Sequence, residues 1–124
     1  MPVPLLVIDA ANVVGSVPDG WWRDRAGAAV RLRDRLVPIA TNGLTDLPGP
    51  IEVVVVVEGR ARDIAAIEGV RVERAAGSGD DAIVDLVAAT VPDQRVVVVT
   101  ADRQLRSRVT ELGAEVRGPS SIPR

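Results

Sequence analysis

The stretch LLVIDAANVVG, residues 5–15, begins with four apolar residues and then reaches Asp9. A continuous apolar run of this kind is typical of a strand that is buried on both faces. A carboxylate at the end of such a strand has two explanations. It either caps the segment that follows or holds a metal ion. The other apolar runs of the chain bear on this choice.

Those runs alternate with helical patterns. The predicted strands are residues 4–10, 51–59, 70–75, 94–102 and 114–118. The predicted helices are residues 23–40, 60–68, 80–91 and 103–112, with loops at 13–22 and 41–50. Alternating strands and helices predict parallel pairing through right-handed crossovers. We therefore expect an α/β fold, a three-layer α/β/α sandwich with a mainly parallel five-stranded sheet, in a single domain spanning residues 1–124. A strand order of 3-2-1-4-5 would place the first and fourth strands side by side.

Composition excludes several kinds of chemistry. The chain has 124 residues with no His, Cys, Tyr or Lys, and all fifteen basic residues are arginine. This excludes Ser-His-Asp and Cys-His catalysis, zinc held by Cys or His, and a P-loop lysine. An enzyme of this composition must use carboxylates, hydroxyls, amides and arginine. Carboxylates without imidazole partners favour hard cations such as Mg²⁺ or Mn²⁺.

The expected surroundings of the protein follow from charge and hydropathy. No apolar run approaches the ~20 residues of a membrane span, and the N-terminus lacks the basic and apolar regions of a signal peptide. With no cysteine, a cytoplasmic protein with no membrane contact is expected. The net charge is −2, so any attraction to nucleic acid must come from a local patch of arginines.

Acidic residues follow four successive predicted strands. They are Asp9, Glu58, Asp80, Asp81 and Asp102. The carboxyl ends of parallel strands share one edge of a sheet, so these acids should meet there and repel one another unless a divalent cation binds. Simpler roles remain open for each: Ser78 can cap a helix that begins with two acids, and Asp102 can cap the next helix.

Other polar and aromatic residues accompany the acids. The Asn12 amide can hold a phosphate oxygen, a water or the preceding carboxylate, or it forms an Asx-turn. Thr100 brings a hydroxyl to the same edge, and Asp85 is either an outer acid or an exposed helix residue. Trp21 and Trp22 either stack on nucleobases or pack over a helix end.

The motifs VIDAANVVG, VEGR, GSGDDAIVDLV and VVTADRQLRSRVTELGAEV resemble, in this order and spacing, the PIN-like superfamily. Within it the sequence is most similar to the NYN domain branch, which includes small bacterial ribonucleases of the YacP type. The resemblance extends from about Leu5 to Gly118. It implies a PIN-like fold and a metal-dependent ribonuclease that hydrolyses RNA phosphodiester bonds with Mg²⁺ or Mn²⁺.

The resemblance also implies particular site residues. The implied catalytic residues are Asp9, Asp80 and Asp102. The implied metal ligands are Asp9, Glu58, Asp80, Asp81 and Asp102, supported by Asn12, Thr100 and Asp85. Glu58 stands where the family often has an aspartate. We expect RNA contacts from Arg103, Arg60, Arg23, Trp21 and Trp22, with single-stranded RNA as the favoured substrate. A homodimer or a protein partner would enlarge the small surface available to hold RNA.

Two other functions are compatible with the same residues. One is a catalytically inactive PIN-like module that binds RNA or acts as a scaffold. The other is a metal-dependent phosphohydrolase acting on small nucleotides, whose site would saturate with mononucleotides.

Overall fold

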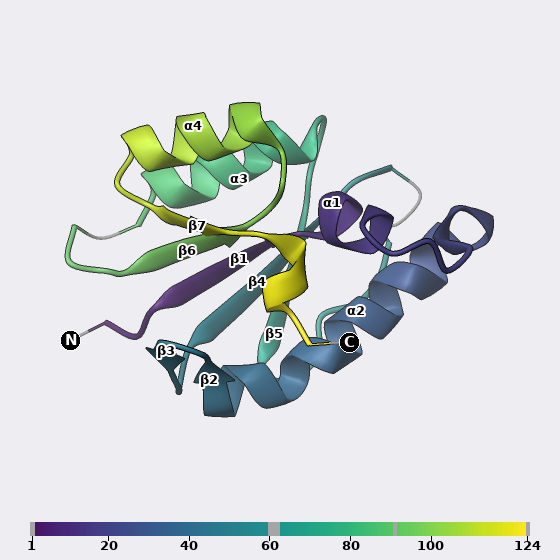
Figure 1. Cartoon of the computed structure of the whole chain (residues 1–124), viewed down its shortest axis with the longest axis horizontal. Coiled ribbons are helices and arrows are strands. Elements are labelled where there is room, and N and C mark those ends of the chain that lie inside the picture. Colours follow the sequence, from purple (N-terminus) through teal and green to yellow (C-terminus); the bar gives the residue numbers. More distant parts are fainter. Residues whose placement is uncertain (1, 60–62, 91, 124) are drawn as a thin grey trace.

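A five-stranded parallel sheet forms the centre of the protein. The computed structural model describes residues 2–59, 63–90 and 92–123. The sheet contains β1 (Leu5–Asp9), β4 (Glu52–Val57), β5 (Val70–Arg74), β6 (Val96–Val99) and β7 (Glu115–Arg117). Their spatial order is β5-β4-β1-β6-β7, with every neighbouring pair parallel (Figure 1). The predicted order, with the first and fourth strands side by side, is therefore confirmed.

Helices cover both faces of this sheet and complete the three predicted layers (Figure 1). On one face lie α3 (Gly79–Ala88) and α4 (Arg103–Glu111), and on the other lie α1 (Ala10–Gly15) and α2 (Arg25–Asn42). None of the helices in the described part of the chain is long and apolar enough to cross a membrane.

The core is divided into two apolar clusters by the sheet. Successive residues of a strand point to opposite faces. Leu6 and Ile8 accordingly belong to the cluster under α1 and α2, whereas Leu5 and Val7 belong to the cluster under α3 and α4. Because β1 is covered on both sides, all five of its residues are buried, including Asp9 at its end. The valine-rich composition of the strands is explained by this double burial.

The connection from β1 to α2 differs from the predicted loop over residues 13–22. Helix α1 begins directly after Asp9 and continues to Gly15, and a 3₁₀ turn, η1 (Trp21–Arg23), follows. A helix of six residues is too short to show a 3.6-residue apolar pattern, so no helix was expected here, although Ala10 and Val13 are buried. Helix α2 starts two residues later than predicted, where Asp24 accepts a hydrogen bond from the Gly27 N–H at 2.9 Å.

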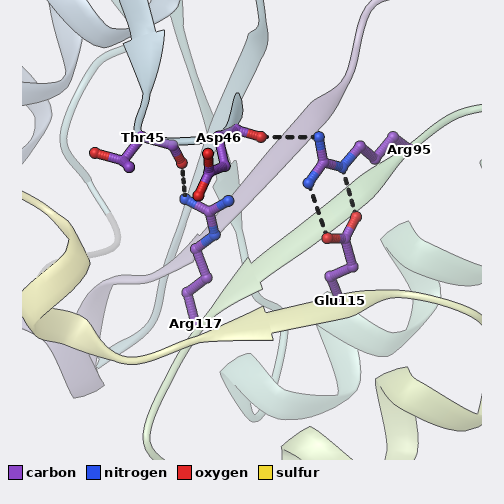
Figure 2. A network of polar contacts seen from close by, with 5 residues as sticks. All are labelled: Thr45, Asp46, Arg95, Glu115 and Arg117. Carbon is purple, nitrogen blue, oxygen red and sulfur yellow. Dashed lines mark hydrogen bonds and ion pairs between the residues drawn. The ribbon is translucent and has the colours of Figure 1, made fainter. Parts of the chain in front are cut away.

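The predicted connector at 41–50 contains a hairpin of β2 (Gly43–Leu44) and β3 (Leu47–Pro48). Figure 2 shows how two arginines hold it to the sheet: Arg95 donates to the Asp46 carbonyl at 3.1 Å, and Arg117 donates to the Thr45 carbonyl at 2.7 Å. The hairpin buries Leu47 completely in the cluster under α2.

The helix predicted at 60–68 is wrong over the residues that the structure describes there. Residues 60–62 lie outside the described residues, residues 64–66 are not helical, and Ile67 forms an isolated bridge with Val70. Ile64 is buried and Ile67 packs against the same core cluster. The described part of this segment contributes both isoleucines to the core in an irregular conformation rather than as a helix. At the C-terminal end, the turn η3 (Pro119–Ser121) leads to Ile122, which is buried against the same cluster.

Candidate active site at the carboxyl ends of the strands

Asp9 lies at the centre of the candidate site. It is the last residue of β1, and only 7% of its surface is exposed. Its Oδ2 accepts a hydrogen bond from the Thr100 hydroxyl at 2.8 Å, and its Oδ1 lies 3.5 Å from the Asn12 backbone nitrogen, which donates to it. The second contact makes Asp9 the N-cap of α1. Asp9, which ends the buried strand, therefore caps helix α1. Its Oδ2 is held by Thr100, the residue that follows β6.

Asn12 and Thr100 join the ends of β1 and β6. The Asn12 Oδ1 accepts a hydrogen bond from the Ala101 N–H at 2.8 Å. The Thr100 hydroxyl oxygen accepts one from the Asp102 N–H at 3.1 Å. Thr100 is fully buried, and its carbonyl accepts a hydrogen bond from Arg106 Nε at 2.9 Å. These bonds fix the turn after β6 against Asp9, so two of the three predicted supporting residues, Asn12 and Thr100, lie beside it.

The other acids approach Asp9 from three further elements. Asp102 caps α4, and its Oδ1 accepts a hydrogen bond from the Leu105 N–H at 3.0 Å. Glu58 follows β4, and its Oε2 accepts a hydrogen bond from the Gly79 N–H at the start of α3. Asp80 lies half-buried in the first turn of that helix. Asp9, Glu58, Asp80 and Asp102 are called the acidic rim below.

Burial and mutual repulsion shift the protonation of the acidic rim. Burial raises the pKa of Asp9, repulsion from Asp80 and Glu58 adds to the rise, and the hydrogen bonds from Thr100 and Asn12 oppose it. Burial also raises the pKa of Asp80, and repulsion from Asp102 and Glu58 adds to it. A group whose charged form is disfavoured by its neighbours is a candidate for a functional role.

The donor atoms of the acidic rim suit a hard divalent cation, because carboxylate oxygens are the ligands that Mg²⁺ and Mn²⁺ prefer. Within residues 2–59, 63–90 and 92–123, however, no three acidic side chains are close enough to hold one ion together. The chemistry of the residues fits such an ion, whereas their present positions do not form a complete set of ligands.

Two predicted site acids point elsewhere. Asp81 forms an ion pair with Arg108 at 3.0 Å, and its backbone N–H donates to the Ser78 hydroxyl oxygen at 3.2 Å. Ser78 is thus the N-cap of α3, as expected from the sequence. Asp85, one turn further along, is exposed. Successive helical residues are rotated by about 100°, so Asp80 and Asp81 face different surroundings.

The residues predicted to contact RNA are spread around this edge. Trp21 and Trp22 meet edge to face, with ring centroids 5.9 Å apart and planes at 86°. Trp22 is 52% exposed, whereas Trp21 is half-buried. Arg23 ends η1, and Arg103 begins α4; both are exposed. Arg60 lies outside the described residues.

A cleft of about 400 Å³ opens beside the acidic rim, between α1, η1, the start of α2 and the end of β4. It is called the α1 cleft below, and Trp21, Arg25 and Glu58 line it together with small apolar residues of α1. The Arg25 guanidinium carbon lies 5.5 Å from the centroid of the Trp21 ring. Sequence reasoning did not select Arg25. Its position four residues after a tryptophan was the available signal.

The fold and the acidic rim together define an α/β/α protein with carboxylates gathered where its parallel strands end. Neither family models nor curated proteins match the chain. Two solved structures of Rae1 (YacP) from Bacillus subtilis match it in fold. One aligns with a TM-score of 0.75 and 17% sequence identity, covering 98% of this chain and 71% of that one. The W164L mutant aligns with a TM-score of 0.73 and 17% identity, covering 97% and 72%. At this identity, the comparison establishes that this chain has the fold of Rae1.

Proposed function

We propose that this protein is a metal-dependent ribonuclease of the NYN branch of the PIN-like superfamily, with the acidic rim as its active site. The observation that carries the proposal is Asp9, a buried carboxylate with a raised pKa that faces further acids on one edge of the sheet. The sequence motifs resemble the branch that includes the YacP-type ribonucleases, and the fold is that of a YacP structure. Both support the proposal.

Asp9, Asp80 and Asp102 would hold the metal, and Glu58 would lie beside them. A bound Mg²⁺ or Mn²⁺ lowers the pKa of a bound water and neutralises charge on the scissile phosphate. Thr100 orients the Asp9 carboxylate by donating to its Oδ2 at 2.8 Å. Because the pKa values of Asp9 and Asp80 are raised, protons should compete with a cation for these carboxylates as the pH falls.

The substrate would be single-stranded RNA. An unpaired strand can place its bases against aromatic side chains. Trp21 lines the cleft beside the acidic rim, and Trp22 packs against Trp21. Exposed arginines such as Arg23 and Arg103 would contact flanking phosphates, which fixes the position of the strand without selecting its sequence.

A second function, a non-catalytic module that binds RNA, is favoured by one observation. No three acids in the described part of the chain are close enough to hold an ion together. In such a module Asp9 and Asp102 would act only as the helix caps that they already are.

The test is cleavage of a single-stranded RNA in Mn²⁺ and in Mg²⁺ by the wild type and Asp9→Asn, with metal binding followed by calorimetry. We expect Asp9→Asn to lose metal binding and to cut at least about 100-fold more slowly, the scale of loss on removing one charge-stabilising group. Asp93→Asn is the matched control, since Asp93 is an exposed acid before β6, at the opposite edge of the sheet. It should behave like the wild type.

Other outcomes separate the rival functions. RNA binding without cleavage, equal in wild type and Asp9→Asn, would establish the binding module. Hydrolysis of mononucleotide phosphates in preference to RNA would establish the phosphohydrolase.

A further inference from the structure

We propose that the α1 cleft binds one nucleobase of the RNA and selects guanine, with Trp21 as the stacking surface and Glu58 as the residue that reads the base. This inference rests on the proposed function, because it identifies the substrate group next to the acidic rim. It also gives Glu58 a role in base selection rather than in metal binding.

The size and lining of the α1 cleft suit a nucleobase. Ala10, Ala11 and Val14 line it from α1, and Ala29 lines it from α2. These small side chains leave a volume of about 400 Å³, within the range of sites that enclose small molecules. An apolar lining with a few polar groups is the usual composition of such a site.

The α1 cleft also has the flat partners that a base requires. Trp21 lines it, and the Arg25 guanidinium lies over the Trp21 ring with its carbon 5.5 Å from the ring centroid. Trp22 meets Trp21 edge to face and restricts its position. Aromatic rings and guanidinium planes are the two surfaces on which unpaired RNA bases stack.

Glu58 supplies the polar selection. An ionised carboxylate can only accept hydrogen bonds. Its Oε2 accepts from the Gly79 N–H, whereas no donor among the described residues bonds to its Oε1. Guanine offers two adjacent donors, its ring N1–H and its amino group, on the edge that single-stranded RNA exposes. Uracil offers one N–H between two carbonyl oxygens, which a carboxylate repels.

The position of the α1 cleft places this base beside the proposed chemistry. Asp9 pairs with Val56 across β1 and β4, so Glu58 follows only two residues beyond that register. Ala10 and Ala11 directly follow Asp9 in the chain and line the cleft. A base held here would therefore belong to a nucleotide next to the phosphate at the acidic rim.

The first test uses tryptophan fluorescence with GMP and UMP as probes in a metal-free buffer. The chain has two tryptophans, so Trp22→Phe leaves Trp21 as the sole emitter and Trp21→Phe leaves Trp22. We expect GMP to quench Trp21 saturably and to leave the Trp21→Phe variant without saturable quenching. UMP should bind at least about tenfold more weakly, because it loses a hydrogen bond to a charged group. Equal binding of GMP and UMP, or no quenching of Trp21, would overturn the inference.

The second test uses Glu58→Gln, which keeps an oxygen for the Gly79 N–H and removes the charge. We expect its GMP-to-UMP affinity ratio to fall towards one, and its RNA cleavage to lose any preference for guanine at the neighbouring position. Glu111→Gln, at an exposed residue that ends α4, should keep the wild-type ratio. If Glu58→Gln abolishes cleavage of every RNA and leaves the ratio unchanged, Glu58 is a metal ligand and the inference is wrong.

The two proposals fail separately. RNA cleavage without mononucleotide binding would remove the base site and leave the ribonuclease. Selective GMP binding in a protein that cuts no RNA would remove the ribonuclease and leave a guanine-binding module.

Discussion

Acidic side chains have opposite surroundings at two places on the same sheet. At the acidic rim, burial and neighbouring acids raise the pKa of Asp9 and of Asp80. At the start of β7, Glu115 binds Arg95 through both carboxylate oxygens at 2.6 and 2.9 Å, and this contact lowers the pKa of Glu115 (Figure 2). Arginines therefore neutralise the acid near the hairpin, whereas the acidic rim keeps its repulsion. Repulsion between acids weakens the folded state, and such a cluster is expected where a bound ligand relieves that repulsion.

The largest effect on the acidic rim is expected from a substitution at Thr100. Thr100→Val removes the hydroxyl that donates to Asp9 Oδ2 and accepts from the Asp102 N–H, so both groups lose this partner. Asp9 keeps its Asn12 N–H partner at Oδ1. We expect a loss of about 1–3 kcal/mol in the free energy of unfolding, measured by urea denaturation. We also expect the pKa of Asp9 to rise further, which moves the acidic limb of the cleavage pH profile upward. Thr100→Ser keeps the hydroxyl and should restore both quantities, and a serine variant as unstable as the valine variant would contradict this account.

A smaller effect of opposite sign is expected at Asp80. Asp80→Asn removes a charge that Asp102 and Glu58 repel, so the variant should unfold at a higher temperature than the wild type. The gain should stay below about 1 kcal/mol, because the side chain is only partly buried and water screens the repulsion. Asp81→Asn is the control, since it breaks the exposed pair with Arg108 and should change stability by less than about 0.5 kcal/mol in the destabilising direction. A loss of stability in Asp80→Asn would show that the acid stabilises the fold.

The smallest effects concern the pH dependence of stability. Glu115 has a lowered pKa, so its contribution is present above 4.5 and is lost as the pH falls through its folded value. Asp9 has a raised pKa, so the folded state gains stability as the pH falls from neutral through that raised value towards 3.8. The free energy of unfolding can be followed by urea denaturation from about pH 3 to 7. Glu115→Gln should remove the loss of stability at low pH, and Asp9→Asn should remove the gain as the pH falls from neutral. If the two substitutions changed the pH dependence of the unfolding free energy in the same direction, the comparison between Glu115 and Asp9 would be wrong.

The strands could be predicted because both faces of each central strand are buried. A run such as Val53–Val57 has no polar face, and only a sheet covered on both sides accommodates it. The strand order did not follow from the pattern of apolar runs: 3-2-1-4-5 was one possible order, and the structure has it. The short elements could not be predicted in this way. The two residues of β2 and the two of β3 carry no periodic pattern, and they form because Leu47 fills the core under α2.

For the candidate site, the sequence by itself determined the edge of the sheet at which the acids lie. Asp9, Glu58, Asp80 and Asp102 each follow a strand, and parallel strands end at one edge of a sheet. Only the tertiary structure decided where each side chain points. The phase of α3 directs Asp81 to Arg108, and the start of α3 brings the Gly79 N–H to Glu58. Chain position fixes the edge on which a residue lies, whereas helix rotation and packing fix its direction, and those depend on contacts between residues far apart in the sequence.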